Sequence, residues 1–279
     1  MGNCNWINNN NNNNNPYNTT QPCNTNTCNT NSCNTNTSNT PSTNDCCCCP
    51  ESMKKALGLI SNTALADYID FTNFAFVLSN VSVGGALTTT IGGGTNNPSD
   101  NLSYDTPATF QCVECNLVRI TTTPVYLSGE ATPIIDVNYL SLCDLAVAKF
   151  SVDEELFTTS TTATNECYPA CNISSWASFK SYFRSLLDKK VNGSNCQCCS
   201  NDCCCENDIL NKVNSCIAGS RGPTVSLIAN GWVGEGLEVL GKIGCVLVLT
   251  DNNTATASPD VDDPNIFFVC LDKIGGFLA

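Results

Sequence analysis

Runs of consecutive cysteines constrain this chain more than any other feature of its sequence. Four cysteines stand together at Cys46–Cys49 and three at Cys203–Cys205. Neighbouring Cα atoms lie about 3.8 Å apart, whereas the Cα atoms of a relaxed disulfide lie about 4.4–6.8 Å apart. Cysteines within a run are therefore poor partners for one another, and their side chains point in several directions. Because several identical subunits supply such partners more easily than one packed domain, the runs predict intermolecular disulfides.

The predicted cross-linking cysteines fall into three groups. The first is a five-residue repeat, Cys-Asn-Thr-Asn followed by Thr or Ser; the second is the run at 46–49; the third is a cluster at 196–205. The candidates for intermolecular disulfides are Cys23, Cys28, Cys33, Cys46, Cys47, Cys48, Cys49, Cys196, Cys198, Cys199, Cys203, Cys204 and Cys205.

Composition excludes several functions. The 279 residues include 22 cysteines and no histidine, so the commonest general base and the commonest metal ligand are both missing. A net charge of −13 argues against nucleic acid as a partner, because no basic stripe is present to neutralise phosphates. No apolar run reaches the roughly 18 residues that a membrane-spanning helix needs. We therefore expect neither an enzyme nor a bound cofactor, and neither nucleic acid nor membrane as a partner.

Metal binding is the alternative use of the thiols. Cys112 and Cys115 form one C-x2-C pair, and Cys196 and Cys199 form another, about 80 residues further on. Zinc knuckles commonly lie about 15–20 residues apart, so this spacing is a weak signal, and the 196–205 cluster would be the main ligand source. Cysteines among apolar neighbours fit a buried thiol and a disulfide equally well. These are Cys143, Cys216, Cys245 and Cys270.

Two regions differ sharply in composition. Residues 1–45 consist mainly of Asn, Thr, Ser and Cys, with Asp45 as the one charged residue. Such a segment has little apolar surface to bury and cannot offset its ordering entropy, so we predict a disordered arm. Residues 46–279 are predicted to form the self-assembling body. That body is long enough to build a substantial core, so it does not need many disulfides merely to fold.

The body is predicted to be α+β: strand-rich, mostly antiparallel, with two or three helices. One helix begins at Pro50 and continues to about Ile60, another follows a cap at Ser175 and stops at Gly193, and a short one is expected at 207–217. The segment 236–242 resembles a phosphate loop but lacks the Ser or Thr that holds Mg²⁺, so we predict a strand there. Strand-like runs occupy 68–87, 108–123, 125–127, 134–140, 145–159, 224–232, 237–250 and 266–274.

The start of the chain does not fit the usual pattern for a disulfide-rich protein. Such proteins usually belong to oxidising compartments, and a secretory signal opens with basic residues and an apolar stretch. Here no Lys or Arg precedes Lys54 and no apolar stretch is present. Two explanations fit: reduced thiols that hold metal in a cytosol, or a material made inside a cell and oxidised afterwards.

The chain resembles the cysteine-rich exosporium proteins of clostridial spores, especially the type that forms the hexagonally ordered basal layer. The resemblance rests on the Asn/Thr-rich arm with its cysteine repeat, on the run 46–49 followed by Pro50, and on the 196–205 cluster. The resemblance implies a structural protein made in the mother cell without a signal peptide. It implies a homo-oligomer in a hexameric two-dimensional lattice on the spore surface, locked by disulfides and in contact with other coat or exosporium proteins. It brings no catalytic residues. A cysteine-rich protein of another spore-coat layer would share these features.

Overall fold

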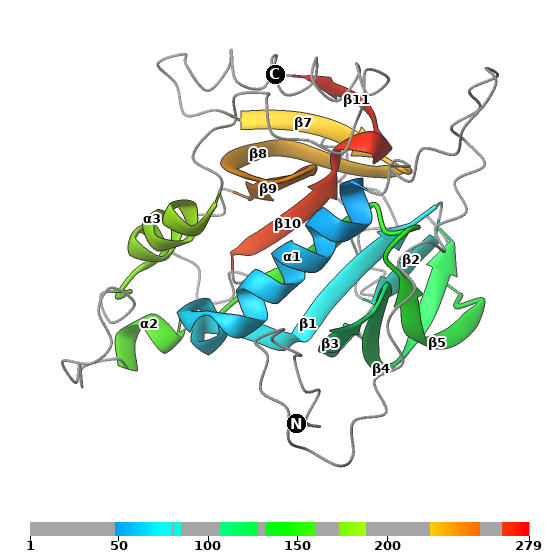
Figure 1. Cartoon of the computed structure of the whole chain (residues 1–279), viewed down its shortest axis with the longest axis horizontal. Coiled ribbons are helices and arrows are strands. Elements are labelled where there is room, and N and C mark those ends of the chain that lie inside the picture. Colours follow the sequence, from blue (N-terminus) through cyan, green and yellow to red (C-terminus); the bar gives the residue numbers. More distant parts are fainter. Residues whose placement is uncertain are drawn as a thin grey trace, which may run out of the picture.

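An antiparallel sheet of eleven strands is the framework of the molecule (Figure 1). The computed structural model describes residues 48–79, 81–84, 107–127, 132–153, 155–159, 173–187, 224–251 and 264–278. All pairings between the named strands are antiparallel, and three α-helices accompany them. The predicted strand-rich, antiparallel class with few helices is confirmed. The arm at 1–45 and the helix expected at 207–217 lie outside the described residues.

The described residues contain α-helices, strands and the 3-10 helices η1 and η4. The helical elements are α1 (Cys48–Asn62), η1 (Ala64–Tyr68), α2 (Glu155–Thr159), α3 (Trp176–Leu186) and η4 (Leu271–Lys273). The strands are β1 (Ile69–Leu78), β2 (Val81–Gly84), β3 (Phe110–Glu114), β4 (Leu117–Leu127), β5 (Ile135–Ser141), β6 (Val147–Val152), β7 (Thr224–Ala229), β8 (Trp232–Ile243), β9 (Val246–Thr250), β10 (Asn265–Cys270) and β11 (Ile274–Leu278).

Strands β2 and β3 share one position in the sheet. β1 pairs with β2 along its last four residues and with Ala108, just before β3, at Phe74. The Phe74 and Ala108 backbones exchange hydrogen bonds of 2.9 and 2.8 Å. β4 pairs with β2 near its end and with β3 near its start, so both short strands lie between β1 and β4. The eleven strands therefore fill ten positions, in the order β11-β7-β8-β9-β10-β6-β1-(β2, β3)-β4-β5, and β11 and β5 are the edges.

A glycine is needed where β2 ends against the start of β3. Gly84 has a φ of +86°, which side chains other than glycine rarely adopt. A Cβ at this position would also press on the carbonyl oxygen of Phe74 and the backbone nitrogen of Ala108. Gly84 thus allows the two strands to follow each other in one position of the sheet.

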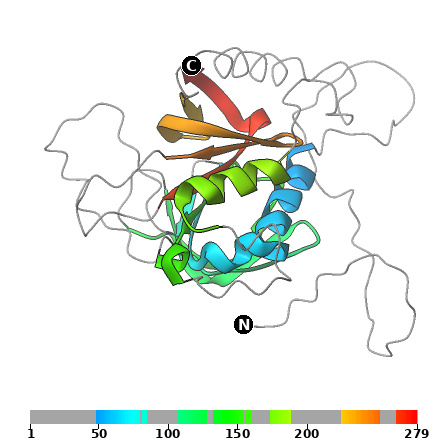
Figure 2. The ribbon, with the colours of Figure 1, turned by 90° about the vertical axis from the view of Figure 1, so that its left-hand side faces the viewer.

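The sheet separates two hydrophobic clusters. The helix-side cluster includes Phe74, Val248 and Phe268 and packs against α1 and α3, which lie on the same face of the sheet (Figures 1 and 2). The far-side cluster includes Trp232 and Phe267, whose rings stack with centroids 5.3 Å apart. Because apolar side chains cover both faces, every residue of β9 and β10 is buried. Such strands read as continuous apolar runs instead of alternating patterns.

Helix α3 has the predicted cap and apolar face. The Ser175 hydroxyl accepts a hydrogen bond from the Ser178 amide at 3.2 Å, and the Ser178 side chain accepts one from the Ser175 amide, completing a capping box. Trp176, Phe179 and Phe183 are buried from this helix. The helix ends at Leu186, before the predicted stop at Gly193, which lies outside the described residues.

Several predicted strand-like runs have a different structure: those at 68–87, 108–123 and 224–232 each contain a turn between two strands, β4 continues from 117 to 127 across the predicted break at 124, and the run at 266–274 includes η4. The run predicted at 145–159 ends as strand β6 at Val152, and its last part is the short helix α2. A carboxylate oxygen of Asp153 accepts a hydrogen bond from the Glu155 amide at 2.9 Å, which starts that helix. The run predicted at 237–250 is a hairpin of β8 and β9 with Gly244 in its turn, and the segment resembling a phosphate loop is part of strand β8, as predicted.

Replacing Ser175 with alanine should destabilise the protein by about 1 kcal/mol, because the amides of the first turn of α3 lose their side-chain acceptor. Urea unfolding followed by circular dichroism measures the difference. Ser185→Ala, an exposed position later in the same helix, is the matched control and should change stability by less than about 0.5 kcal/mol. Equal losses in the two variants would show that the capping box does not stabilise α3.

Candidate cross-linking site

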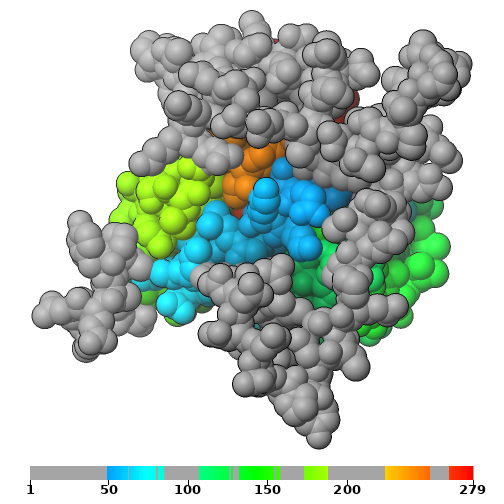
Figure 3. Space-filling model, in the orientation of Figure 1, coloured from blue at the N-terminus to red at the C-terminus, as the bar shows by residue number. Residues whose placement is uncertain are grey.

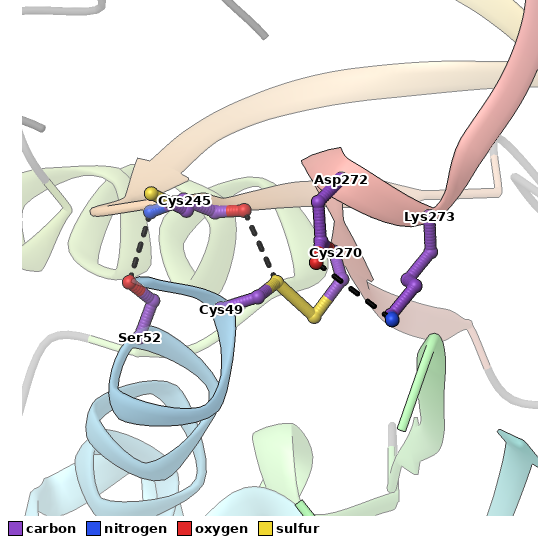
Figure 4. The surroundings of a disulfide bond; sticks show 6 residues. All are labelled: Cys49, Ser52, Cys245, Cys270, Asp272 and Lys273. Carbon is purple, nitrogen blue, oxygen red and sulfur yellow. Dashed lines mark hydrogen bonds and ion pairs between the residues drawn. A yellow bond between two sulfur atoms is a disulfide. The ribbon is translucent and has the colours of Figure 1, made fainter. Parts of the chain in front are cut away.

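The first turn of α1 is joined covalently to the end of β10 (Figure 4). The sulfur atoms of Cys49 and Cys270 form a disulfide that links residues 221 positions apart, with their Cα atoms 5.7 Å from each other. This Cα distance lies in the usual range for disulfides. The bond fastens the first described helix of the body to one of its last strands.

The turn between β8 and β9 completes this junction. The backbone amide of Cys245 donates a hydrogen bond of 2.9 Å to the Ser52 hydroxyl, one turn after Cys49 on α1. The carbonyl oxygen of Cys245 accepts a 3.0 Å hydrogen bond from the Leu271 amide and lies 3.5 Å from the Cys49 sulfur. Because both backbone groups of Cys245 are engaged, the helix, the turn and the end of β10 are positioned together.

Gly244 makes the close approach of α1 to this turn possible. Its φ of +55° lies in the left-handed region that favours glycine. A Cβ here would also overlap the Ser52 hydroxyl. The residue therefore meets two requirements, one of backbone conformation and one of space.

The disulfide is buried within the helix-side cluster. Cys49 and Cys270 are 3% and 0% exposed, and Met53, Leu57 and Ile60 of α1 are fully buried along the same side of the helix. In the space-filling view, the outer side of α1 is visible on the surface of this face (Figure 3). Burial limits the access of a thiolate to either sulfur, and access is one of the factors that set the rate of thiol–disulfide exchange.

A carboxylate lies beside the buried sulfur atoms. A side-chain oxygen of Asp272 is within 4.8 Å of the sulfurs of Cys49 and Cys270, and Lys273 forms an ion pair with Asp272 at 3.8 Å. Burial raises the pKa of Asp272 above its ordinary value, and the charge of Lys273 partly opposes that rise. When ionised, Asp272 disfavours a thiolate at either cysteine and repels an attacking one. The ion pair with Lys273 offsets part of this effect.

Cys49, Cys270 and Asp272 also form a group of three metal-ligand types among the described residues. Zinc and copper bind cysteine as a thiolate, and a sulfur in a disulfide is not a thiolate. In the oxidised form, the two cysteines therefore form a covalent link, and the three residues do not form a metal site.

The structure corrects the expectation for Cys49. The run at 46–49 predicts an intermolecular bond for this residue, but Cys49 is bonded to Cys270 inside the chain because its position on α1 turns it into the core. A signal for this was present, since Cys49 precedes Met53 by four residues and so begins the apolar stripe of the helix. Of the other candidates, only Cys48 has a described backbone, at the start of α1. The remaining eleven lie outside the described residues.

Other cysteines in the body are oxidised too. Cys112, Cys115, Cys143 and Cys245 are also disulfide-bonded. For Cys143, Cys245 and Cys270, whose sequence context fitted a thiol or a bond, the structure selects the bond; Cys216 lies outside the described residues. The C-x2-C pair at 112 and 115 therefore consists of bonded cysteines and not of metal-binding thiolates.

This cysteine-rich body is similar in sequence to known proteins. Residues 47–279 match the family model described as "Spore coat protein CotA-like". The chain belongs to this family. It is also 29% identical over 265 residues to the spore coat protein CotA of Clostridioides difficile strain 630, an alignment that covers 82% of each chain. No solved structure matches the chain. The clostridial spore resemblance noted in the sequence is thus confirmed, and none of the helices in the described part of the chain is long and apolar enough to cross a membrane.

Removing the buried disulfide by the double change Cys49→Ala and Cys270→Ala should cost about 2–5 kcal/mol of unfolding free energy, because the bond restricts the unfolded chain over a long loop. Denaturant unfolding of oxidised protein measures the loss. Wild type and variant should then be compared in reductant, where the difference should shrink. If the variant is equally impaired under both conditions, the cost comes from packing and not from the bond.

Asp272 should make the protein less stable as pH rises. Because its pKa in the folded state is raised, the folded protein binds more protons than the unfolded chain between the two pKa values. Its favourable contribution is complete below the ordinary pKa of 3.8 and is lost as pH rises through the folded-state pKa. The variant Asp272→Asn should flatten this part of the stability–pH curve in urea unfolding.

Asp136→Asn, at an exposed carboxylate of β5, removes the same charge and serves as the control. It should leave the slope of the curve near that of wild type. Identical curves for wild type and Asp272→Asn between pH 4 and 7 would contradict a raised pKa at Asp272.

Proposed function

We propose that this chain is a structural protein of the bacterial spore surface that assembles into a two-dimensional lattice and is locked by intermolecular disulfides. The observation that carries the proposal is the set of adjacent cysteines, which are poor partners for one another, in a chain of the spore coat CotA-like family. The exosporium basal layer is the proposed location, with synthesis in the mother cell. Other copies of the chain in hexameric order, together with other coat or exosporium proteins, are the proposed partners.

We assign different roles to two groups of cysteines: some form bonds inside the chain, and others are proposed to form bonds between subunits. The body has two hydrophobic clusters and a buried internal disulfide that ties α1 to β10. This framework holds α1 against the sheet. The run at 203–205 is assigned to links between subunits because adjacent cysteines are poor partners for one another.

The described polar groups also fit a structural role. The most connected set joins β1, β6, β10 and the end of β9: Asn73 donates to Ser151 at 2.9 Å, Ser151 donates to Asn265 at 2.9 Å, and Asn265 donates to Asp251 at 2.7 Å. Each member has its partner in a neighbouring strand, which is how buried polar groups are normally satisfied. This set stabilises the strand ends.

Oxidised full-length protein should run on a non-reducing gel as large species, and reductant should return it to a band of 29.7 kDa. Electron microscopy of the same sample should show ordered sheets. Changing Cys203, Cys204 and Cys205 together to serine should leave the subunit folded and reduce the large species. The internal pair Cys49→Ala and Cys270→Ala is the matched control and should keep them.

Two outcomes decide against this function. Oxidised wild-type protein that remains a clean monomer would remove the cross-linking role. Protein purified in reductant with stoichiometric zinc or copper, and unfolded by a chelator, would favour the thiolate metal-binding alternative, because such binding is coupled to folding.

A further inference from the structure

Both edges of the sheet carry exposed apolar side chains. On β11 and its neighbour β7, Leu278 is 74% exposed and Ile228 is 45% exposed. On β5, at the opposite edge, Ile135 is 60% exposed and Tyr139 is 43% exposed. An edge strand offers unpaired backbone groups to another chain, and proteins usually protect such edges with charge, proline or a covering element. β11 contains neither a charged residue nor a proline.

The direction of the edge strands suits a second copy of the same chain. All pairings are antiparallel, so neighbouring positions alternate in direction. With ten positions, β11 and β5 run in opposite directions. When a second copy continues the sheet with its helix side on the same face, its β11 is antiparallel to β5 of the first, and the alternation continues across the contact. Because the sheet is twisted, the second copy is rotated relative to the first (Figure 1). An odd number of positions would have produced a parallel pair.

The most exposed apolar residues of the two edges lie on the same face of the sheet. Ile135 pairs with Val125, which belongs to the helix-side cluster, so Ile135 is on the helix side of β5. Leu278 pairs with Ser226, which alternates with the far-side residues Val225 and Leu227, so Leu278 is also on the helix side. When the sheet continues from one copy to the next, the most exposed apolar residues of the two edges lie on the same face.

A groove beside β5 can accept a side chain from the neighbouring copy. It has a volume of about 250 Å³ and is lined mainly by apolar residues of β1, β2, β4 and β5, among them Leu78, Val81 and Val137. Pockets for drug-sized ligands are commonly about 300–1,000 Å³, so this groove fits a large apolar side chain better than a small molecule. Leu278 of a neighbouring copy, on the same face, is a side chain of this kind.

Charge also restricts where copies of this chain can meet. With a net charge of −13, two copies repel each other unless they approach through surfaces with few carboxylates. β11 has no charged residue, and β5 has only Asp136, which alternates with Ile135 and Val137. The two edges are thus suitable for contact between identical acidic chains.

The geometry points to a head-to-tail contact in which β11 of one copy pairs antiparallel with β5 of the next and extends the sheet. Such a contact joins two different surfaces, and the rotation between copies decides whether it closes into a ring or continues as an open row. This inference rests on the proposed self-assembly and identifies one non-covalent contact of the lattice. The disulfides then link copies that are already aligned.

The test uses full-length protein whose free thiols are alkylated after purification, so that association is non-covalent. Analytical ultracentrifugation should show that wild type associates, whereas Leu278→Lys and Ile135→Lys each sediment as a monomer of 29.7 kDa. Leu156→Lys, at an exposed position of α2, makes the same change in charge and should associate like wild type. Thermal melts should confirm that all three variants are folded.

An equimolar mixture distinguishes this contact from a symmetric one. The Leu278→Lys protein keeps an intact β5 and the Ile135→Lys protein keeps an intact β11, so the mixture should form one-to-one dimers and nothing larger. If either variant alone forms dimers, the contact is β5 with β5 or β11 with β11, and the inference is overturned. A mixture that stays monomeric while wild type associates overturns it as well.

Failure of this inference can be separated from failure of the proposed function. Alkylated wild type that remains a monomer overturns the edge contact. If the same protein, not alkylated, still forms reductant-sensitive large species on oxidation, the proposed cross-linking function stands without it.

Discussion

The junction of α1 with the β8–β9 turn and the end of β10 is the interaction on which the rest of the structure depends. The Cys49–Cys270 disulfide and the hydrogen bond from Cys245 to Ser52 hold the start of the helix in place. That position lays the apolar stripe of α1 over the helix-side face of the sheet. Strands β9 and β10, which are buried on both faces, could not tolerate the loss of this cover, because their apolar side chains would then face water.

The parts of the fold that were predicted correctly are those with local signals. Pro50 followed by an apolar periodicity marks α1, and Ser175 followed by Trp176, Phe179 and Phe183 marks α3. Each signal lies within a few residues of the structure that it specifies. Strand-rich content follows in the same way from runs such as Ile266–Cys270, where β-branched and aromatic residues fit a pleated, buried surface.

The parts that could not be predicted depend on contacts between distant residues. The partner of Cys49 lies 221 positions away, and spacing alone does not choose among many possible pairings. The shared position of β2 and β3 depends on the approach of Gly84 to Ala108, which no local pattern reveals. The helix α2 was hidden in an apparently strand-like run, because the cap that Asp153 provides outweighs the weak helix preference of the threonines that follow.

The burial of the Cys49–Cys270 disulfide has a consequence for the order of folding and oxidation. Under the proposed synthesis inside the mother cell, the chain folds before its thiols are oxidised, and the aromatic contacts that connect Phe74, Phe150, Phe268 and Phe183 belong to a core that forms before the disulfide closes. Once Cys49 and Cys270 are joined, their burial slows exchange with other thiols. The later oxidation that we propose for the other cysteines then leaves the bond inside each copy in place.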